Sequence, residues 1–503
     1  MAFEAIREDR GPTSTPVLPA HLGRPAIIAV FVCIAFGSVL RILAAQTDLW
    51  LDEIWTFELL PRIMSPTDVL FELHYANNHP LNTLFLYWIG DAGEQFLWYR
   101  LHSVVAGVWS IAVAVLIAAR RGRAEAVFAA FLFAGSFILV HHASQARGYS
   151  MMIAAALTAF YAAQRYHDSR SWASAGVYAV ATAWALLSNL YYLQSLIAVS
   201  VWSGCLLLER GLRQGQGFGA ISPIVRLHVV PTIVFGFVVQ VFYMQGLVGS
   251  QFFTDKYGII FQAASLVFGG PQTGEIAENL LLVACAIAGL GIAALWRDTD
   301  REWLFYALAI FGAPAVVLYV SETQSLFVRF FVMSQVFGLL LLAISLGRLW
   351  RLHWVGALVA SAVALLISLG NASYIEALIE RGRGQYFDAV RYMASESIGS
   401  QSTTGSDYPF GTQMVVRWYE RFLPGEEFFF VSEEDPRRAP LWYVRVGHPR
   451  PAEMTYANHL YDKDREFLTS AFGFSWQLYR RVPMVDAVRR RSAPDSQAGQ
   501  PTR

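Results

Sequence analysis

Two adjacent carboxylates, Asp52 and Glu53, follow the first long apolar run directly, in the stretch LWLDEIW. A carboxylate in a partly desolvated cleft can accept a proton from a hydroxyl or amine nucleophile, so Asp52 is a candidate general base. Neighbouring side chains point in different directions, and Glu53 would then support the site. The alternative is structural, because acidic residues are also favoured in the first turn of an interfacial helix.

A second group of polar residues lies at the borders of apolar runs. A histidine before a helix stands where anions gather, although a proline after it does no more than open the helix. An arginine on a poorly charged face needs an anionic ligand, a carboxylate or a lipid headgroup, and its planar fork suits a phosphate. Ordinary snorkelling to lipid headgroups is the alternative for each cation. The candidate binding residues are His79, Arg147, Tyr149, Lys256 and Arg329.

Other residues that could take part in chemistry give weaker evidence of a function. Arg41 lies inside the first apolar run, and we expect a structural arginine paired with a carboxylate of a neighbouring helix. The three cysteines all fall in apolar runs, which predicts neither a disulfide framework nor a cysteine metal site. No His, Cys and carboxylate cluster has metal-ligand spacing. We predict no metal or other cofactor, while a divalent cation at Asp52 stays compatible with the sequence.

The composition places these residues in a membrane protein. The chain has 503 residues, 55% of them hydrophobic and only 15% charged. A soluble domain has about 25% charged residues. Lys+Arg and Asp+Glu are each 38, so the net charge gives no reason to expect a nucleic-acid partner.

Eleven apolar runs are long enough to cross a bilayer as helices. The first is too long for a cleavable signal peptide, so we predict a retained signal anchor behind a cytoplasmic tail at residues 1–25. The runs lie near residues 26–45, 98–118, 124–142, 148–165, 172–189, 190–208, 228–246, 277–296, 303–320, 328–347 and 353–371.

Arginine distribution predicts the orientation, because basic residues are retained in cytoplasmic loops. With the N-terminus inside, the cytoplasmic loops hold most arginines and the outer loops few. An odd number of spans then places the C-terminus in the periplasm or outside the cell. The loops predicted to be cytoplasmic contain Arg120, Arg121, Arg123, Arg165, Arg170, Arg210, Arg213, Arg226, Arg297, Arg301, Arg348 and Arg351.

Three outer segments are too long or too polar to be simple connections. The first, residues 46–95, contains short apolar stretches typical of helices lying at the interface. The second, residues 246–275, lies before the eighth run. The third, residues 372–485, has the pattern of a small α/β domain, with helices at 386–394 and 415–423 and strands at EFFFVSE, LWYVRVG and SWQLYRRV. A polar, disordered tail is expected at 486–503.

Ordered motifs over about the first 350 residues resemble the GT-C membrane glycosyltransferases, especially the dolichyl-phosphate-mannose protein mannosyltransferase and lipid A aminoarabinose transferase group. The matching stretches are LRILAAQTDLWLDEIW, NHPLNTLFLYW, RLHSVVAG, QARGYSM and RFFVMSQ. The stretch that reads HPP in that group reads HPL here, at residues 79–81, and the outer domain shows no match to the group. The resemblance implies a GT-C-like transmembrane catalytic domain at residues 26–371.

The resemblance also implies an activity and roles for the candidates. The enzyme would move a hexosyl or pentosyl group, with inversion, from a polyprenyl-phosphate donor to a lipid, glycan or protein acceptor at the outer face. Asp52 would be the general base with Glu53 orienting the site, and Arg147, Arg329 and Lys256 would stabilise the donor phosphate. The setting would be a bacterial inner membrane and its cell-envelope glycans.

Two other functions fit a polytopic chain. A transporter or flippase of lipid-linked sugars would also need many spans, but it usually has repeated halves, and no internal repeat is present. A binding or scaffold role for the outer domain would leave the membrane part as an anchor, for which eleven spans are excessive.

Overall fold

The computed structural model describes residues 22–75, 77–215, 217–243, 256–320, 326–397, 401–431, 439–447 and 451–486. The N-terminal tail and nearly all of the predicted polar tail lie outside these residues. The chain divides into two compact units. The first takes in residues up to Ile42, Met64–Trp88 and Arg100–Ile375, and the second takes in Leu43–Ile63, Ile89–Tyr99 and Glu376 onward.

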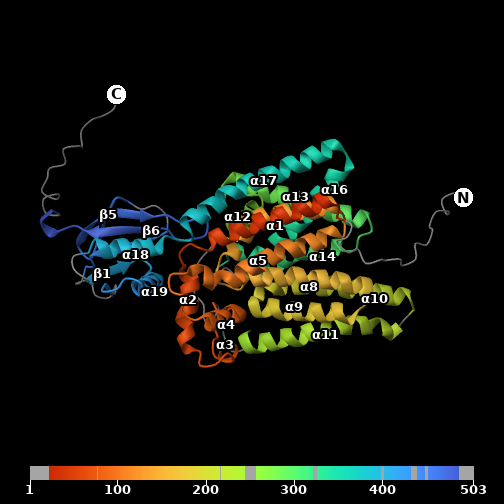
Figure 1. Ribbon diagram of the computed structural model, residues 1–503, viewed down its shortest axis with the longest axis horizontal. Helices are drawn as coiled ribbons and strands as arrows, with labels where there is room; N and C mark the ends of the chain where they lie inside the picture. Colours follow the sequence, from red (N-terminus) through yellow and green to blue (C-terminus); the bar gives the residue numbers. More distant parts are fainter. Residues whose placement is uncertain are drawn as a thin grey trace. The chain divides into compact units, whose positions relative to one another are not determined.

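The first unit is a bundle of helices (Figure 1). The described parts of all eleven predicted apolar runs fall almost entirely on helices, because long runs rich in Leu, Val, Ala and Phe form helices that can be buried on every side. Some of its helices continue into the second unit. The helices of the first unit are α1 (Arg24–Ala44), α3 (Asp68–Phe71), α4 (Pro80–Ile89), α5 (Phe96–Ala119), α6 (Arg123–Gly135), α7 (Phe137–Ala143), α8 (Tyr149–Ser169), α9 (Trp172–Ser188), α10 (Leu193–Arg213), α11 (Ile221–Val238), α12 (Lys256–Val267), α13 (Glu275–Arg297), α14 (Trp303–Ala307), α15 (Ala313–Val320), α16 (Val332–Leu352) and α17 (Trp354–Arg381), with short helical turns η3 (Leu190–Tyr192) and η7 (Val328–Phe331).

The structure does not confirm the predicted number of spans. In the described part of the chain, seven helices are long and apolar enough to cross a membrane, and the bent pair α6–α7 makes an eighth. The expected count of eleven is therefore not confirmed. The other three predicted runs form α8, which carries more polar residues, and two segments of 17 residues, Trp172–Ser188 and Trp303–Tyr319.

A break between α6 and α7 turns the chain by 59°. Such a break frees carbonyls from the helical ladder, and Arg41 of α1 covers them. Its guanidinium donates to the carbonyls of Phe133 at 2.9 Å and Ala134 at 3.2 Å, and to its own helix at Gly37. The structural role predicted for Arg41 is present, but the predicted carboxylate partner is wrong, because the helix break supplies carbonyl oxygens instead.

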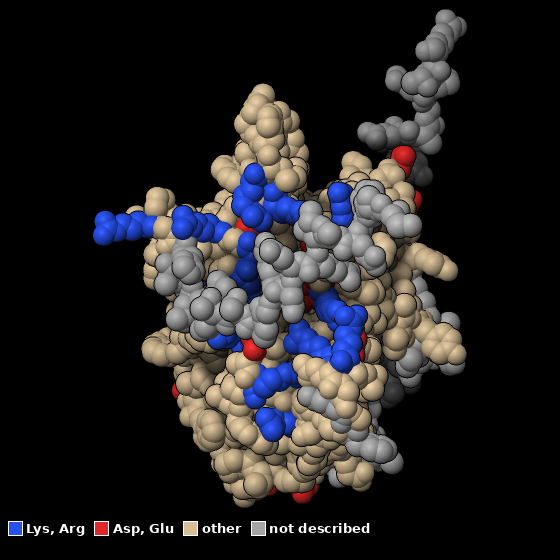
Figure 2. Space-filling model, turned by 90° about the vertical axis from the view of Figure 1, so that its right-hand side faces the viewer, with Lys and Arg blue, Asp and Glu red and all other residues tan. Residues whose placement is uncertain are grey.

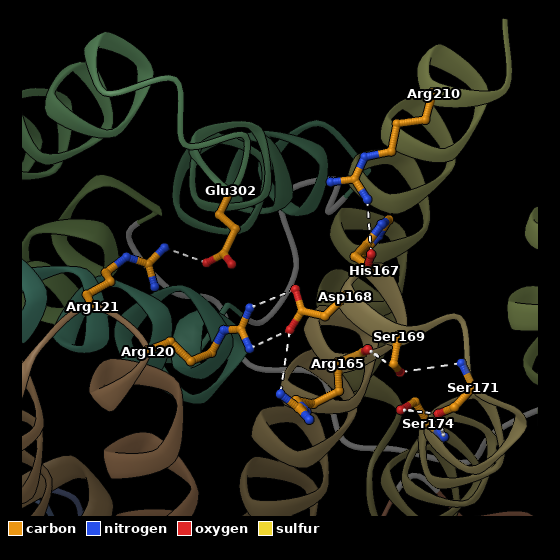
Figure 3. Close-up of polar contacts among 10 residues, drawn as sticks. All are labelled: Arg120, Arg121, Arg165, His167, Asp168, Ser169, Ser171, Ser174, Arg210 and Glu302. Carbon is orange, nitrogen blue, oxygen red and sulfur yellow. Dashed lines mark hydrogen bonds and ion pairs between the residues drawn. The ribbon is translucent and has the colours of Figure 1, made fainter. Parts of the chain in front are cut away.

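The arginine-rich loops meet on one face of the first unit, where blue side chains gather (Figure 2). Ion pairs tie the helix ends together there, some of them drawn in Figure 3. Arg120 pairs with Asp168 at 2.8 Å, and Arg121 pairs with Asp300 at 2.8 Å. The pairs Arg301–Glu209, Arg348–Asp298 and Arg351–Glu125 link further loops. The loops grouped from arginine content therefore share a face.

The second unit contains a mixed six-stranded sheet of order β2-β1-β3-β6-β5-β4. Strands β1, β2 and β3 are parallel, while β6, β5 and β4 complete the sheet in antiparallel pairing. Helices α18 and α19 pack against β1. The elements are α2 (Leu51–Leu59), α18 (Tyr386–Ser395), α19 (Pro409–Glu420), β1 (Gln401–Ser406), β2 (Glu427–Phe430), β3 (Trp442–Val446), β4 (Glu453–Tyr456), β5 (His459–Phe467) and β6 (Trp476–Arg481).

The predicted α/β class of this C-terminal part is confirmed, and so are both predicted helices and all three predicted strands. The second helix begins earlier than expected, at Pro409, where proline is suited to a first helical turn. Strands β1, β4 and β5 were not predicted. Strands β4 and β5 are joined at Ala457 and Asn458, which both have positive φ, as a tight hairpin turn requires.

Candidate active site

The first unit brings four of the predicted binding residues together. His79 lies at the start of α4, Arg147 and Tyr149 lie at the start of α8, and Arg329 lies in η7. The first three side chains are buried, with exposures of 3% to 5%, and Arg329 is half-buried. Three segments that are far apart in sequence therefore build one polar site inside an apolar bundle.

Arg147 and His79 are joined directly. One guanidinium nitrogen of Arg147 donates to Oδ1 of Asn77 at 2.5 Å, and the other lies 3.0 Å from Nε2 of His79. Arginine can only donate, so Nε2 must accept and the proton of the neutral ring sits on Nδ1. That nitrogen lies 3.0 Å from the carbonyl of Ser188, to which it donates. The contacts fix both the ring orientation and the tautomer.

The same surroundings keep His79 uncharged. Burial lowers the pKa of His79 well below its ordinary value, and the positive charges of Arg147 and Arg329 lower the pKa further. The hydrogen bond to Ser188 opposes this change without reversing it. His79 is consequently a neutral positioning group for Arg147 near pH 7 and not a second cation.

Aromatic rings form a wall beside the two arginines. The ring of Tyr149 lies 5.2 Å from His79 and 4.8 Å from His142 of α7. Tyr191 of η3 is hydrogen-bonded with the side chain of Arg329 and interacts electrostatically with Arg147. Such rings hold cations in place and offer hydroxyl groups to a ligand, while apolar surface excludes water.

Gly148 permits the close approach that this site needs. A Cβ at this position would lie 1.9 Å from the carbonyl oxygen of Ser188 and 3.1 Å from Cβ of His79. Any side chain would therefore push the start of α8 away from the end of α9. The glycine of the QARGYSM stretch is explained by this packing.

The second unit holds the predicted catalytic carboxylates. Asp52 and Glu53 lie in the first turn of α2, as the structural interpretation expected. Glu53 is fully buried, and its carboxylate accepts a hydrogen bond from the backbone N–H of Trp50 at 3.1 Å, which closes the start of the helix. Asp52 is half-buried. The two neighbours therefore have different surroundings.

Asp52 faces tyrosines of its own unit. Burial and then the charge of Asp52 raise the pKa of Tyr408, which precedes α19. A third carboxylate, Asp48, accepts from the backbone N–H of Phe387 at 2.8 Å and thus completes the start of α18. Asp48 has a structural task, whereas Asp52 remains partly open to a ligand.

The remaining site predictions have simpler outcomes. Lys256 is the first residue of α12, and its side chain is outside what the structure describes. No group of three or more His, Cys, Asp or Glu among the described residues could hold a metal ion. Sequence reasoning missed Asn77, Ser188, Tyr191 and His142. Asn77 lies two residues before His79, directly ahead of the NHPL stretch, but nothing in the sequence marked the other three.

Comparison with solved structures relates this architecture to a known fold. No protein-family model matches the chain, and no curated protein matches it. ArnT from Cupriavidus metallidurans in the apo state matches with a TM-score of 0.50 and 13% identity, covering 90% of this chain and 98% of that chain. ArnT from the same organism bound to undecaprenyl phosphate is similar at a TM-score of 0.48 and 13% identity, with coverage of 90% and 97%. The chain therefore has the fold of ArnT in the apo state, and the GT-C resemblance stated from sequence is confirmed at the level of fold.

Proposed function

We propose that this protein is a membrane glycosyltransferase that transfers a sugar from a polyprenyl-phosphate donor to an acceptor at the outer face. The observation that carries the proposal is the group formed by the buried Arg147, His79 and Tyr149 with the half-buried Arg329. Two arginines share this site with a histidine that is kept neutral, so the site has a net positive field suited to a phosphate.

The proposed reaction develops negative charge on the leaving phosphate and releases a proton from the acceptor. A hydroxyl or amine of the acceptor loses its proton to Asp52, and its lone pair attacks the anomeric carbon from the face opposite the phosphate. The bond between that carbon and the phosphate oxygen breaks, which inverts the centre and releases polyprenyl phosphate. Arg147 and Arg329, with Lys256, stabilise the charge on the leaving phosphate. Glu53 holds the first turn of α2 and thereby orients Asp52.

The proposed setting is a bacterial inner membrane with the N-terminus in the cytoplasm. The arginine-rich face in Figure 2 supports this orientation, because positive charge is retained on the cytoplasmic side. With the predicted odd number of spans, the C-terminal α/β domain would lie in the periplasm. Either a hexosyl or a pentosyl donor and a lipid, glycan or protein acceptor satisfies the chemistry.

The test is transfer of radiolabelled sugar from polyprenyl-phosphate donors to a membrane extract of the native host. We expect Asp52→Asn to reduce transfer by roughly 10²–10⁴-fold while donor binding is retained, as removal of a general base does. Glu58→Gln is the matched control, since Glu58 is an exposed carboxylate of the same helix. Equal transfer by Asp52→Asn would exclude Asp52 as base and turn attention to Glu53.

A lipid-linked-sugar transporter is the second candidate, and the bent pair α6–α7 is the observation in its favour. Broken helices commonly line transport sites. Here, however, Arg41 occupies the carbonyls that the break frees. Failure of every donor to support transfer would favour the transporter.

A further inference from the structure

Three arginines gather at the C-terminal end of α8 on the arginine-rich face. Arg210 of α10 donates to the carbonyl of His167 at 3.0 Å (Figure 3), and Arg226 of α11 reaches the carbonyl of Arg170 at 3.5 Å. Burial and then the charge of Arg210 lower the pKa of Arg170. Positive charge is thus concentrated where α8, α10 and α11 meet.

Several other arginines on this face form ion pairs, whereas Arg170, Arg210 and Arg226 form none with the described residues, although the charge of Asp168 acts on Arg210. Asp168 lies 2.8 Å from Arg120 and 3.7 Å from Arg165, and Arg213 pairs with Glu209 at 2.7 Å. Among the described residues, no carboxylate forms an ion pair with Arg170, Arg210 or Arg226. The end of a helix supplies only about half a unit of negative charge. Capping of α8 therefore balances a small part of the positive charge.

The same place holds an unsatisfied buried group and a strained arginine. His167 is 8% exposed, and neither of its ring nitrogens has a hydrogen-bond partner within the described ranges. The charges of Arg210 and Arg170 both act on it. Arg170 itself has a φ of 53°, a left-handed conformation that glycine adopts more readily at a helix end. The chain keeps an arginine where glycine would fold more easily.

An apolar track leads from the arginines along α9. Trp172 is 69% exposed and lies under the guanidinium of Arg226 at 4.2 Å. Val180 and Trp184 are 67% and 50% exposed. Their spacing of eight and then four residues places all three on one side of the helix. A molecule with an anionic head and long apolar chains would match both the arginines and the track.

We propose that Arg170, Arg210 and Arg226 form a binding site for the phosphate of an anionic phospholipid, whose acyl chains lie along the Trp172–Trp184 side of α9. Arginine donates two bonds to phosphate oxygens, and basic pockets between helices on the cytoplasmic side are suited to such headgroups. The exposed tryptophan at the start of α9 lies at headgroup level. A soluble phosphate would leave the apolar track unused.

The test is native mass spectrometry of the purified full-length chain with phosphatidylglycerol or phosphatidylcholine of the same acyl chains. We expect phosphatidylglycerol to bind more tightly, and Arg210→Gln and Arg226→Gln each to weaken it by roughly tenfold, as loss of a charge-assisted hydrogen bond does. Arg213→Gln is the matched control, because it removes the same charge from the same helix at an arginine already paired with Glu209. It should bind like the wild type.

Arg170→Gly separates binding from folding. This change relieves the left-handed backbone, so its Tm in phosphatidylcholine should equal or exceed that of the wild type while phosphatidylglycerol binding falls. If Arg213→Gln and Arg210→Gln lost phosphatidylglycerol binding equally, the proposed site would be wrong, and diffuse surface charge would account for the binding. Stabilisation by inorganic phosphate alone, equal to that by phosphatidylglycerol, would overturn the lipid assignment. Sugar transfer is not the readout, so these results are independent of the proposed function.

Discussion

Arg147 connects the most separated parts of the candidate site. Its two terminal nitrogens contact Asn77 and His79, and its charge acts on Tyr191 of a third segment. The planar fork suits this arrangement, because its two terminal nitrogens are held apart and each bonds a different acceptor. The residue type therefore matters beyond its charge.

Arg147→Lys tests that statement. We expect kcat/KM for sugar transfer to fall by roughly 10–100-fold, since one charge-assisted hydrogen bond is lost and His79 loses its fixed tautomer. Steady-state kinetics with a polyprenyl-phosphate donor measures the effect. Arg213→Lys, which changes an exposed arginine of the arginine-rich face, should leave kcat/KM unchanged. Full activity of Arg147→Lys would contradict a role for the fork.

His79 should make the fold sensitive to acid. Its pKa is depressed in the folded state, so the unfolded chain binds a proton first, at pH values below about 6.5. Stability is fully present above that pH and is lost as the pH falls, by up to about 1.4 kcal/mol per pH unit. Tm measured against pH should decline less steeply for His79→Gln than for the wild type. An identical decline would assign the acid sensitivity to other groups.

The contact between α8 and α9 is the element-scale feature that shapes the site. Gly148→Ala would place a methyl group against Ser188, and we expect a destabilisation of about 1–3 kcal/mol or more. Gly176→Ala in the middle of α9 is the control, because no atom outside the helix backbone lies within 4 Å of its Cβ position. That change should stabilise by about 0.5–1 kcal/mol. Thermal unfolding in detergent compares the two, and a smaller loss at Gly148 would show that the helix ends can separate.

Apolar helices were predictable from sequence, whereas half of the sheet was not. The described parts of the apolar runs are helical because their length and hydrophobicity favour a helix over a strand. Strand β1 lies inside the sheet but contains the polar sequence QSTTGS. Its buried Ser402 and Ser406 are satisfied by Ser397 and Thr412, so burial there does not depend on an apolar pattern. Strand β5 is rich in charged residues that pair locally, such as Lys463 with Glu466.

The candidate site was predictable only in part for a related reason. Arginines and a histidine at the ends of apolar runs are conspicuous, and Arg147, Arg329 and His79 meet in the first unit. Asn77 and Ser188 contribute an amide and a backbone carbonyl, which look the same in any loop. Their importance depends on contacts between residues 70 and 109 positions apart.

At the scale of the whole molecule, orientation is the property that decides which side each site serves. We expect a membrane-impermeant maleimide to label Arg417→Cys in spheroplasts, and to label Ser169→Cys only after the membrane is disrupted. Both positions are exposed, and Cys33, Cys205 and Cys285 would first be replaced by alanine. The reverse labelling pattern would place the arginine-rich face outside.

Arg41 also has a consequence for biogenesis. Its carbonyl partners lie 92 and 93 residues further along the chain, so they do not exist when α1 leaves the ribosome. At about 5–20 residues per second, the first span waits roughly 5–18 s with an arginine in its last turn, whose charge makes insertion less favourable. Arg41→Leu should therefore increase insertion of an α1 reporter segment yet lower the Tm of the finished protein. The arginine makes nascent-chain insertion less favourable and the completed bundle more stable.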